Sequence, residues 1–232
     1  MKKIGFVGAY DKTDLILYVA RILVETGKTV LVVDSTTTQK AKYIVPVINP
    51  TTSYVTYFEG IEVAVGFHDF IEMKRYLGMP DSAALDYDYI LIDIDNPQIL
   101  ENFGIDNSME CYFVTSFDLY SLKRGLEILS GITETMELTK VLFSKNMTKE
   151  EDDYLNFLSM GYKIKWEEER IYFPMESSDR NVIIENQRLS KIKLKRLSTA
   201  YKDSLIYLTD KIDKDDNSSV ITRAVKQIEK GA

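Results

Sequence analysis

Lys12 and Thr13 stand between a short apolar segment and an apolar run of helical period, where a loop could bind phosphate. Such a loop needs backbone N–H groups that close around phosphate oxygens, a Lys that supplies positive charge and a hydroxyl that holds Mg²⁺. Gly8 supplies one flexible backbone position, but Asp11 stands directly before Lys12. A carboxylate there adds negative charge where a phosphate would lie. The sequence therefore predicts a nucleotide loop with altered chemistry.

Two aspartates end apolar runs elsewhere in the chain. Asp34 follows the apolar residues 29–33, and Asp93 follows the apolar residues 89–92. Uninterrupted apolar runs of this length are typical of strands that are buried on both faces of a parallel sheet. Ligands of open α/β sheets bind outside the carboxyl ends of the strands, so Asp34 and Asp93 are candidate site residues.

Local structural roles for the same residues stay open as alternatives. Asp11 or Thr13 could cap the N-terminus of a helix, in which case Lys12-Thr13 would be only its first turn. Asp93 and Asp95 could cap loops instead of binding a ligand. The combination of Lys12-Thr13 with two strand-ending acids favours a vestigial phosphate site over these local roles.

The elements that must position these residues follow from the periodicity of the apolar residues. Apolar runs predict strands at residues 4–7, 29–33, 89–93, 111–115 and 141–144. Helical spacing predicts helices at residues 14–26, 69–77, 119–130, 150–160 and 198–212. Two further β-rich runs lie within 54–67, and no regular element is predicted between 174 and 198. Strands that alternate with helices predict an α/β fold with a doubly wound, mostly parallel sheet and helices on both faces.

Composition limits the classes of function that the chain can serve. The 232 residues are 45% hydrophobic and 28% charged, which predicts one large globular domain. The net charge of −7 argues against a general nucleic-acid surface. Cys111 and His68 are the only residues of their types, so a disulfide framework and a Cys or His metal centre are excluded within one chain. We find neither a signal peptide nor a membrane-spanning run, and expect a soluble, cytoplasmic protein.

The order of these landmarks resembles the ParA/MinD group of deviant-Walker P-loop ATPases. Residues 7–14 correspond to the phosphate loop of that group, 30–34 to its second strand, 87–93 to its Walker B strand and 115–125 to a later segment that leads into a helix. The order and spacing of the motifs carry the resemblance. It covers roughly residues 2–212 and implies a P-loop NTPase-type domain over 1–212. An acidic turn and a short amphipathic tail would follow over 213–232.

The resemblance implies roles for individual residues. Lys12 would contact the β- and γ-phosphates of ATP or ADP, and Thr13 would hold Mg²⁺. Asp93 would lie behind the metal and support its coordination. Asp34 would orient the attacking water in an active member of the group.

Departures from the family pattern put this chemistry in doubt. Gly8 keeps its place in the loop, and Asn146 falls where the family makes contacts to the base. The family's signature lysine, which reaches across a dimer interface, falls instead at Val7, and two loop glycines fall at Ala9 and Asp11. A missing trans-acting lysine removes charge stabilisation on which phosphoryl transfer depends. We therefore expect no significant hydrolysis. ATP or ADP with Mg²⁺ would bind only if the loop still binds phosphate. If the loop no longer binds phosphate, no cofactor binds.

Three functions are compatible with these features. The favoured one is a catalytically impaired ParA/MinD-like protein that acts as a localisation or assembly scaffold for a pilus, secretion, conjugation or partitioning machine. Its nearest analogues are TadZ/CpaE-type proteins, by fold-level analogy. This function implies a homodimer, a protein partner and recruitment to a membrane-associated complex. The alternatives are an active ATPase with an atypical loop, and a nicotinamide-dinucleotide enzyme, because residues 3–9 resemble the opening of hydroxyacid dehydrogenases and Asp34 could bind ribose.

Two segments near the C-terminus could make contacts of their own. A basic run is expected to be a solvated face, with binding to anionic lipid or an acidic partner as the alternative; it comprises Arg188, Lys191, Lys193, Lys195 and Arg196. Residues 220–228 carry an apolar helical stripe that lacks Trp, Phe and Leu. We therefore expect this tail to dock onto the protein body or a partner rather than onto a membrane.

Overall fold

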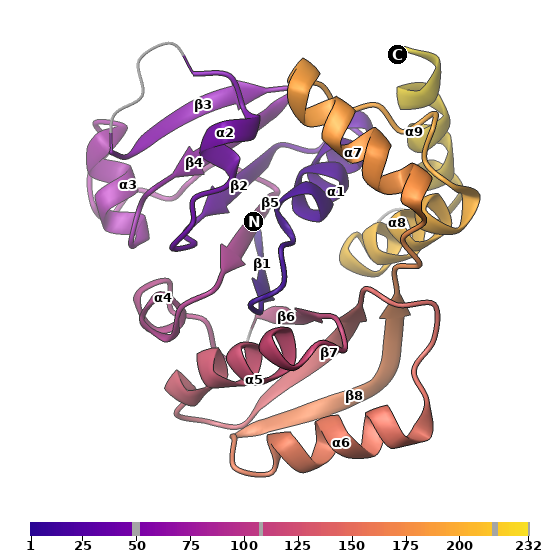
Figure 1. Ribbon diagram of the computed structural model, residues 1–232. Coiled ribbons are helices and arrows are strands. Elements are labelled where there is room, and N and C mark those ends of the chain that lie inside the picture. Colours follow the sequence, from indigo (N-terminus) through magenta and orange to yellow (C-terminus); the bar gives the residue numbers. More distant parts are fainter. Residues whose placement is uncertain (48–51, 107–108, 215–217, 232) are drawn as a thin grey trace.

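One mixed sheet of eight strands organises the computed structural model, which describes residues 1–47, 52–106, 109–214 and 218–231 (Figure 1). The strands are β1 (Lys2–Val7), β2 (Val30–Asp34), β3 (Tyr54–Phe58), β4 (Ile61–Val65), β5 (Tyr89–Ile94), β6 (Glu110–Thr115), β7 (Met136–Leu142) and β8 (Ile164–Tyr172). Their order across the sheet is β3-β4-β2-β5-β1-β6-β7-β8. The pair β3–β4 is antiparallel and the other neighbouring pairs are parallel, which confirms the predicted fold class.

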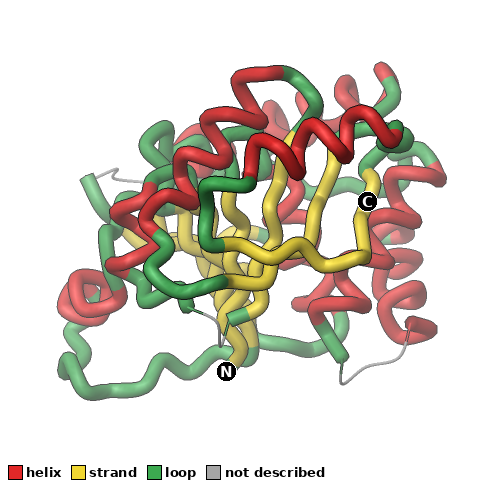
Figure 2. The backbone as a smooth tube through the Cα atoms, turned by 90° about the horizontal axis from the view of Figure 1, so that it is seen from below, coloured by secondary structure: helices red, strands yellow, loops and turns green. Residues whose placement is uncertain are grey.

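Helices cover both faces of the sheet (Figures 1 and 2). They are α1 (Thr13–Glu25), α2 (Ala41–Ile44), α3 (Phe70–Tyr76), α4 (Pro97–Asn102), α5 (Leu119–Ile128), α6 (Lys149–Ser159), α7 (Ser177–Leu189), α8 (Thr199–Ile212) and α9 (Ser218–Lys230). A short 3₁₀ turn, Leu129–Gly131, follows α5. Apolar side chains of α1, α7, α8 and α9 form one core layer with the sheet, and those of α3, α4, α5 and α6 form the other.

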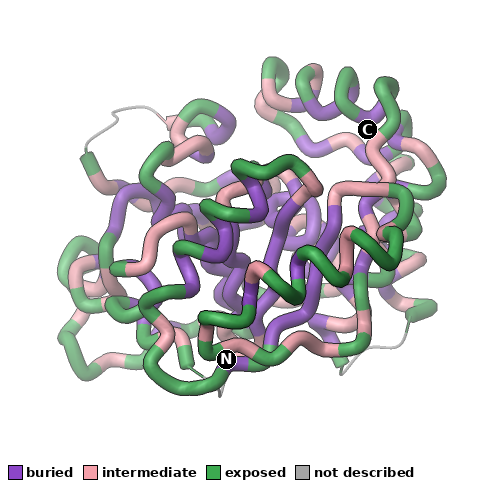
Figure 3. The backbone as a smooth tube through the Cα atoms, turned by 60° about the horizontal axis from the view of Figure 1, so that its bottom comes forward, coloured by how far each residue is buried: buried purple, intermediate pink, exposed green. Residues whose placement is uncertain are grey.

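The central strands are apolar throughout because each one faces both layers. In β2, Val30 and Val32 point into the layer of α1, whereas Leu31 and Val33 point into the opposite layer. Figure 3 shows the resulting buried centre of the molecule. Successive residues of a strand point to opposite faces, so a strand with two buried faces shows no polar alternation.

The structure corrects several boundaries. Helices α2, α4 and α7 were not predicted, and α7 occupies a stretch that the sequence left without a regular element. Its sequence is mostly polar and buries few apolar side chains, so its helical stripe is weak. Strand β7 begins earlier than predicted because its buried Lys140 interrupts the apolar run; this ammonium lies 2.9 Å from the carboxylate of Asp152 and over the ring of Trp166.

The C-terminal helix α9 packs onto the protein body. The sequence predicted that this segment would contact either the protein body or a partner. It lies against α1 and α8, with Ile221, Ala224, Val225 and Ile228 buried. Lys202 of α8 and Glu229 of α9 form an ion pair of 2.8 Å across the contact. Most of the acidic turn expected before this helix lies outside the described residues.

The basic run begins at the end of α7 and continues along the loop between α7 and α8. Ile192 and Leu194 are buried, so the cations that alternate with them face outward or lie at the surface. Arg196 forms an ion pair of 2.5 Å with Glu185. Among the described helices, none is long and apolar enough to cross a membrane.

Candidate functional site

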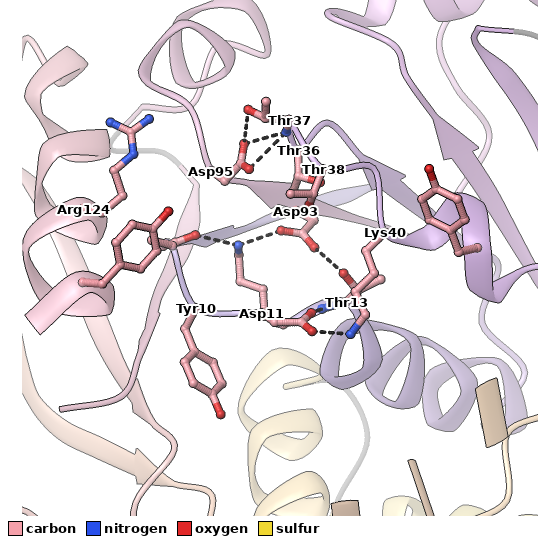
Figure 4. A pocket seen from close by; sticks show the side chains of 15 residues that line it. Tyr10, Asp11, Thr13, Thr36, Thr37, Thr38, Lys40, Asp93, Asp95 and Arg124 are labelled. Atoms are coloured by element: carbon pink, nitrogen blue, oxygen red, sulfur yellow. Dashed lines mark hydrogen bonds and ion pairs between the residues drawn. The ribbon is translucent and has the colours of Figure 1, made fainter. Parts of the chain in front are cut away.

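A cavity of about 540 Å³ opens at the carboxyl ends of β1, β2 and β5 and beside the start of α5 (Figure 4). The loop after β1 contributes residues 8–13 to its lining, and the loop after β2 contributes 36–38 and Lys40. Asp93 and Asp95 come from the end of β5, and Tyr120 and Arg124 come from α5. The parallel sheet brings these residues together because strands of one direction end at the same edge.

Lys12, Thr13 and Asp93 meet at the floor of this cavity. Lys12 is 3% exposed and Asp93 is 2% exposed, and their Nζ and Oδ1 atoms lie 2.7 Å apart. The Lys12 ammonium also donates to the Gly8 carbonyl at 2.9 Å, and the Thr13 hydroxyl donates to Asp93 Oδ2 at 3.4 Å. Burial raises the pKa of Asp93 to about 6, and the charge of Lys12 acts in the opposite direction.

Gly8 allows the loop to leave β1 close to the neighbouring strand. Its φ is +148°, and a Cβ at this position would lie 2.2 Å from the carbonyl oxygen of Val114 in β6. A residue with a side chain would therefore collide with the backbone of the sheet and adopt an unfavourable conformation.

Asp34 holds a loop in place. Its carboxylate accepts hydrogen bonds from the Thr36 backbone N–H at 3.0 Å, the Thr36 hydroxyl at 2.6 Å and the Ala41 N–H at 2.8 Å. Burial raises the pKa of Asp34, and these hydrogen bonds oppose the shift. The residue lies behind the cavity lining, so it fixes residues 35–41 instead of facing the cavity.

Two more candidates have loop positions. Asp95 accepts hydrogen bonds from the Thr37 backbone N–H at 2.9 and 3.0 Å, which is the loop-capping alternative that the sequence left open. Asn146 is exposed, and its carbonyl accepts a hydrogen bond from the Ser144 hydroxyl at 2.7 Å. Asn146 does not line the cavity that holds Lys12.

Asp11 and Lys40 line the partly exposed side of the cavity, where they form an ion pair (Figure 4). Asp11 Oδ1 accepts a hydrogen bond from the Thr13 backbone N–H at 3.3 Å, and Asp11 Oδ2 pairs with the Lys40 ammonium. Lys40 Nζ also lies 3.2 Å from Asp14 Oδ2, which accepts a second hydrogen bond from Gln187 at 2.8 Å. Burial alone would lower the pKa of Lys40, but Asp14 and Asp11 raise it above its usual value. The carboxylate of Asp11 thus lies at the end of α1 that normally attracts anions.

Tyr10 lines both this cavity and a second one of about 370 Å³, as do Asp11 and Lys40. Its ring stacks on Phe143 with 4.5 Å between centroids, and Phe143 stacks in turn on Phe173 at 5.5 Å. Burial raises the pKa of the Tyr10 hydroxyl. An aromatic side chain thus occupies a loop that would need small residues to wrap around phosphate.

The residues present do not fit a nucleotide with Mg²⁺ in this arrangement. The Thr13 hydroxyl and the Asp93 carboxylate are suitable oxygen donors for Mg²⁺. The carboxylate of Asp11, however, already accepts from the N-terminal end of α1, and the Lys12 ammonium is paired with Asp93. Among the described residues, no group of three or more His, Cys, Asp or Glu side chains could hold a metal ion.

Several lining residues were not predicted from the sequence. They are Thr36, Thr37, Thr38, Lys40, Tyr43, Tyr120 and Arg124. Tyr120 and Arg124 lie within the segment 115–125 that resembles the family, but no role was assigned to them there. The other residues form no recognisable motif, because they come from the loop after β2 and from α2. Lys40 pairs with Asp11, before α1, and with Asp14, in its first turn, and no pattern in the sequence predicted this contact.

No protein-family model matches this sequence, and no curated protein matches it. The structure is similar to that of a Borrelia burgdorferi protein assigned to plasmid partition and solved with AMPPNP bound, with a TM-score of 0.53 and 14% sequence identity over 91% of this chain and 99% of that chain. The two proteins share this α/β fold, with a mostly parallel sheet covered by helices.

Two further solved structures are less similar to this chain. A second plasmid partition protein of Borrelia burgdorferi has a TM-score of 0.49 and 12% identity over 90% of this chain and 99% of that chain. pNOB8 ParA bound to nonspecific DNA has a TM-score of 0.47 and 14% identity over 97% of this chain and 99% of that chain. At these identities the likeness concerns the fold alone.

The strand order of the sheet distinguishes this chain from a dinucleotide-binding enzyme. β5 lies between β1 and β2, so the strand that ends in Asp93 is a neighbour of the strand that precedes Lys12. In the dinucleotide-binding order the first and second strands are neighbours, and the acid after the second strand reaches the ribose. The topology thus disfavours the nicotinamide alternative.

Proposed function

We propose that this chain is a ParA/MinD-like protein with impaired nucleotide chemistry, which acts as a localisation or assembly scaffold for a larger cellular machine. The observation that carries the proposal is the position of Asp11. Its carboxylate accepts a hydrogen bond at the N-terminal end of α1 and is paired with Lys40. A phosphate would need the same backbone N–H groups and would be repelled by the same carboxylate.

The charges of the cavity support this proposal. Among its described lining residues, three cations face three carboxylates: Lys12, Lys40 and Arg124 against Asp11, Asp93 and Asp95. A site with no net positive charge gives a triphosphate little electrostatic stabilisation. Val7, at the position of the family's signature lysine, is a fully buried strand residue that pairs with Ile94 and Phe113.

The rim of the cavity is suited to a protein partner. Tyr43 and Tyr120 line the cavity and are 79% and 69% exposed, and Leu119, the neighbour of Tyr120 in the chain, is 57% exposed. Exposed aromatic and aliphatic side chains beside a cavity are typical of interaction surfaces. We infer that a second copy of the chain or a component of the machine covers this rim, which would recruit the protein to a membrane-associated complex.

General nucleic-acid binding is not part of the proposed function. The net charge of −7 opposes it, because phosphate backbones attract proteins mainly through basic residues. A mobility-shift measurement with duplex DNA at about 150 mM salt tests this expectation. A DNA complex that survives this salt concentration would contradict it.

The proposed function is tested by thermal shift with ATP·Mg²⁺ and ADP·Mg²⁺ at millimolar concentration. We expect no shift, because a ligand stabilises only the folded state that it binds. Lys12→Ala is the matched variant, and it should give the same flat response. An ATP-dependent shift that Lys12→Ala abolishes, together with phosphate release, would instead show the active ATPase alternative.

A further inference from the structure

The five cations of the basic run lie in a segment, residues 186–198, that contains no acid, although the whole chain has a net charge of −7. We propose that this run binds the outer face of α6 on a second copy of the chain, so that copies associate head to tail. The outer face of α6 comprises Glu150, Asp153, Tyr154, Phe157 and Met160. Neither surface lines the cavity that holds Lys12, so the inference goes beyond the proposed function.

The basic run is fixed on the protein body before any partner arrives. Ile192 and Leu194 are buried between its cations, and the Asn186 side chain donates to the Lys193 carbonyl at 3.0 Å. Among the described residues, Arg196 is the only cation of the run with a carboxylate partner. A surface that is already ordered loses little conformational entropy on binding, so the other four cations can be paired by acids of a partner at low cost.

A hollow of about 130 Å³ lies within the basic run. Lys193, Lys195 and Arg196 line it together with Val182 and Glu185 of α7. Glu185 is already paired with Arg196, so the charge that remains around the hollow is positive. Such a hollow suits one aromatic side chain flanked by carboxylates, because cations are attracted to the face of a ring and anchors at interfaces fill pockets.

Helix α6 presents an aromatic side chain of this kind. Phe157 is 66% exposed and Met160, on the same face, is 81% exposed. Asp153 lies one helical turn before Phe157, and Glu150 lies one turn before Asp153, so all four share one face. Both acids are exposed, and within the part of the chain that the structure describes neither pairs with a cation. The helix contains four acids and one lysine, Lys149, so its charge is complementary to that of the basic run.

The two surfaces belong to opposite layers of the molecule. Val182 of α7 packs in the layer of α1, whereas Leu155 of α6 packs in the other layer, and Figure 1 shows the two helices on opposite sides of the sheet. A two-fold axis therefore cannot bring both pairs of surfaces together. The contact is head to tail, and each bound copy leaves one surface of each kind at the ends of the assembly, where further copies can add.

Sedimentation velocity of the full chain at concentrations up to about 100 µM tests the proposal. We expect species larger than a dimer, which grow with protein concentration and decrease between about 50 and about 500 mM salt, because salt screens exposed charges. Phe157→Ala should weaken the association at least about tenfold, since it removes the aromatic anchor. Lys191→Glu combined with Lys195→Glu should weaken it by a similar factor, since it reverses the charge of the run.

A mixture of these two variants tests whether the two surfaces bind each other. The Phe157→Ala protein keeps an unaltered basic run, and the protein with Lys191→Glu and Lys195→Glu keeps an unaltered α6. Each variant alone should stay monomeric at concentrations where the unaltered protein associates. The mixture should form a one-to-one pair and no larger species, because only one working surface of each kind remains per pair.

Matched controls alter similar residues elsewhere on the surface. Tyr57→Ala removes an aromatic side chain of β3 that is 68% exposed. Arg223→Glu combined with Lys226→Glu reverses two exposed cations of α9. Both controls should associate as the unaltered protein does, and circular dichroism compares the folding of all variants.

Three results would overturn the proposal. One is an unaltered protein that stays monomeric at every concentration and salt. Another is association that persists in both variants, which would place the contact on another surface, such as the rim of the cavity. The third is binding to vesicles of anionic phospholipid that needs Lys191 and Lys195 but not Phe157, without self-association. An ATP-dependent thermal shift that needs Lys12 would contradict the proposed function and leave this inference unaffected.

Discussion

At the scale of single residues, the charged side chains at the floor of the cavity neutralise one another. Lys12 and Asp93 are both almost fully buried and lie 2.7 Å apart, so each compensates the cost of burying the other. Asp34 is satisfied in another way, by three hydrogen bonds from its own loop. In this structure these carboxylates thus bind a lysine or backbone and hydroxyl groups of the neighbouring loops.

The position of Gly8 leads to a prediction at the same scale. Gly8→Ala places a Cβ 2.2 Å from the Val114 carbonyl at a φ of +148°, so it should lower the free energy of unfolding by at least about 2 kcal/mol. Urea denaturation measures the change. Gly161→Ala is the control, because no heavy atom lies within 4 Å of a Cβ there, and it should change stability by less than about 0.5 kcal/mol. Equal stability of the two variants would contradict the prediction.

At the element scale, side-chain caps decide where several helices begin. Asp69 caps α3, Asp118 caps α5, and Thr148 with Glu151 forms a capping box at α6. These residue types favour an N-terminal position because their oxygens accept from N–H groups that have no partner within the helix. Such local signals explain why helices near these residues could be predicted from the sequence. Helix α7 uses Glu176 at its N-cap, a residue type that gives a weaker signal.

The cap of α5 also makes stability depend on pH. Hydrogen bonds from Ser116 and Ser121 lower the pKa of Asp118 to about 2. Because the pKa of Asp118 is lower in the folded than in the unfolded protein, its ionised carboxylate stabilises the fold above the unfolded-state pKa near 4. This stabilisation is lost as the pH falls through about 2. Asp118→Ala should therefore cost about 1 kcal/mol at pH 6, and the difference should shrink toward pH 2.

Thermal or urea unfolding at several pH values measures the effect of Asp118→Ala. Asp86→Ala removes another exposed carboxylate, which caps no described helix, and serves as the control. A cost for Asp118→Ala that stays constant down to pH 2 would exclude the ionised cap as its cause.

At the scale of the whole molecule, α9 belongs to the same apolar layer as the central strands. Ile221 is fully buried in the layer that also holds α1 and α8. Ile221→Ala should lower the free energy of unfolding by about 2–4 kcal/mol, because the deleted side chain leaves a cavity in a packed layer. Gln227→Ala on the exposed side of α9 is the control and should have little effect.

Unfolding of Ile221→Ala followed by both circular dichroism and tryptophan fluorescence measures this change. Trp166 is the only tryptophan and lies on β8, far along the sequence from α9. We expect the two signals to change together, since one cooperative unit loses all of its structure at once. A separate early transition in the circular dichroism alone would show that α9 unfolds independently.

The sequence by itself determined the fold class and the residues at the floor of the site. Apolar runs that end in Asp34 and Asp93 mark strands buried on both faces, and this pattern is local. The tertiary structure alone decided which charged groups meet in the cavity. Lys40 meets Asp11 from 29 residues away, and β5 comes between β1 and β2, because loops and crossovers unite segments that no short-range pattern connects. Local patterns fix where strands and helices form, but packing of the whole chain decides which charged groups become partners.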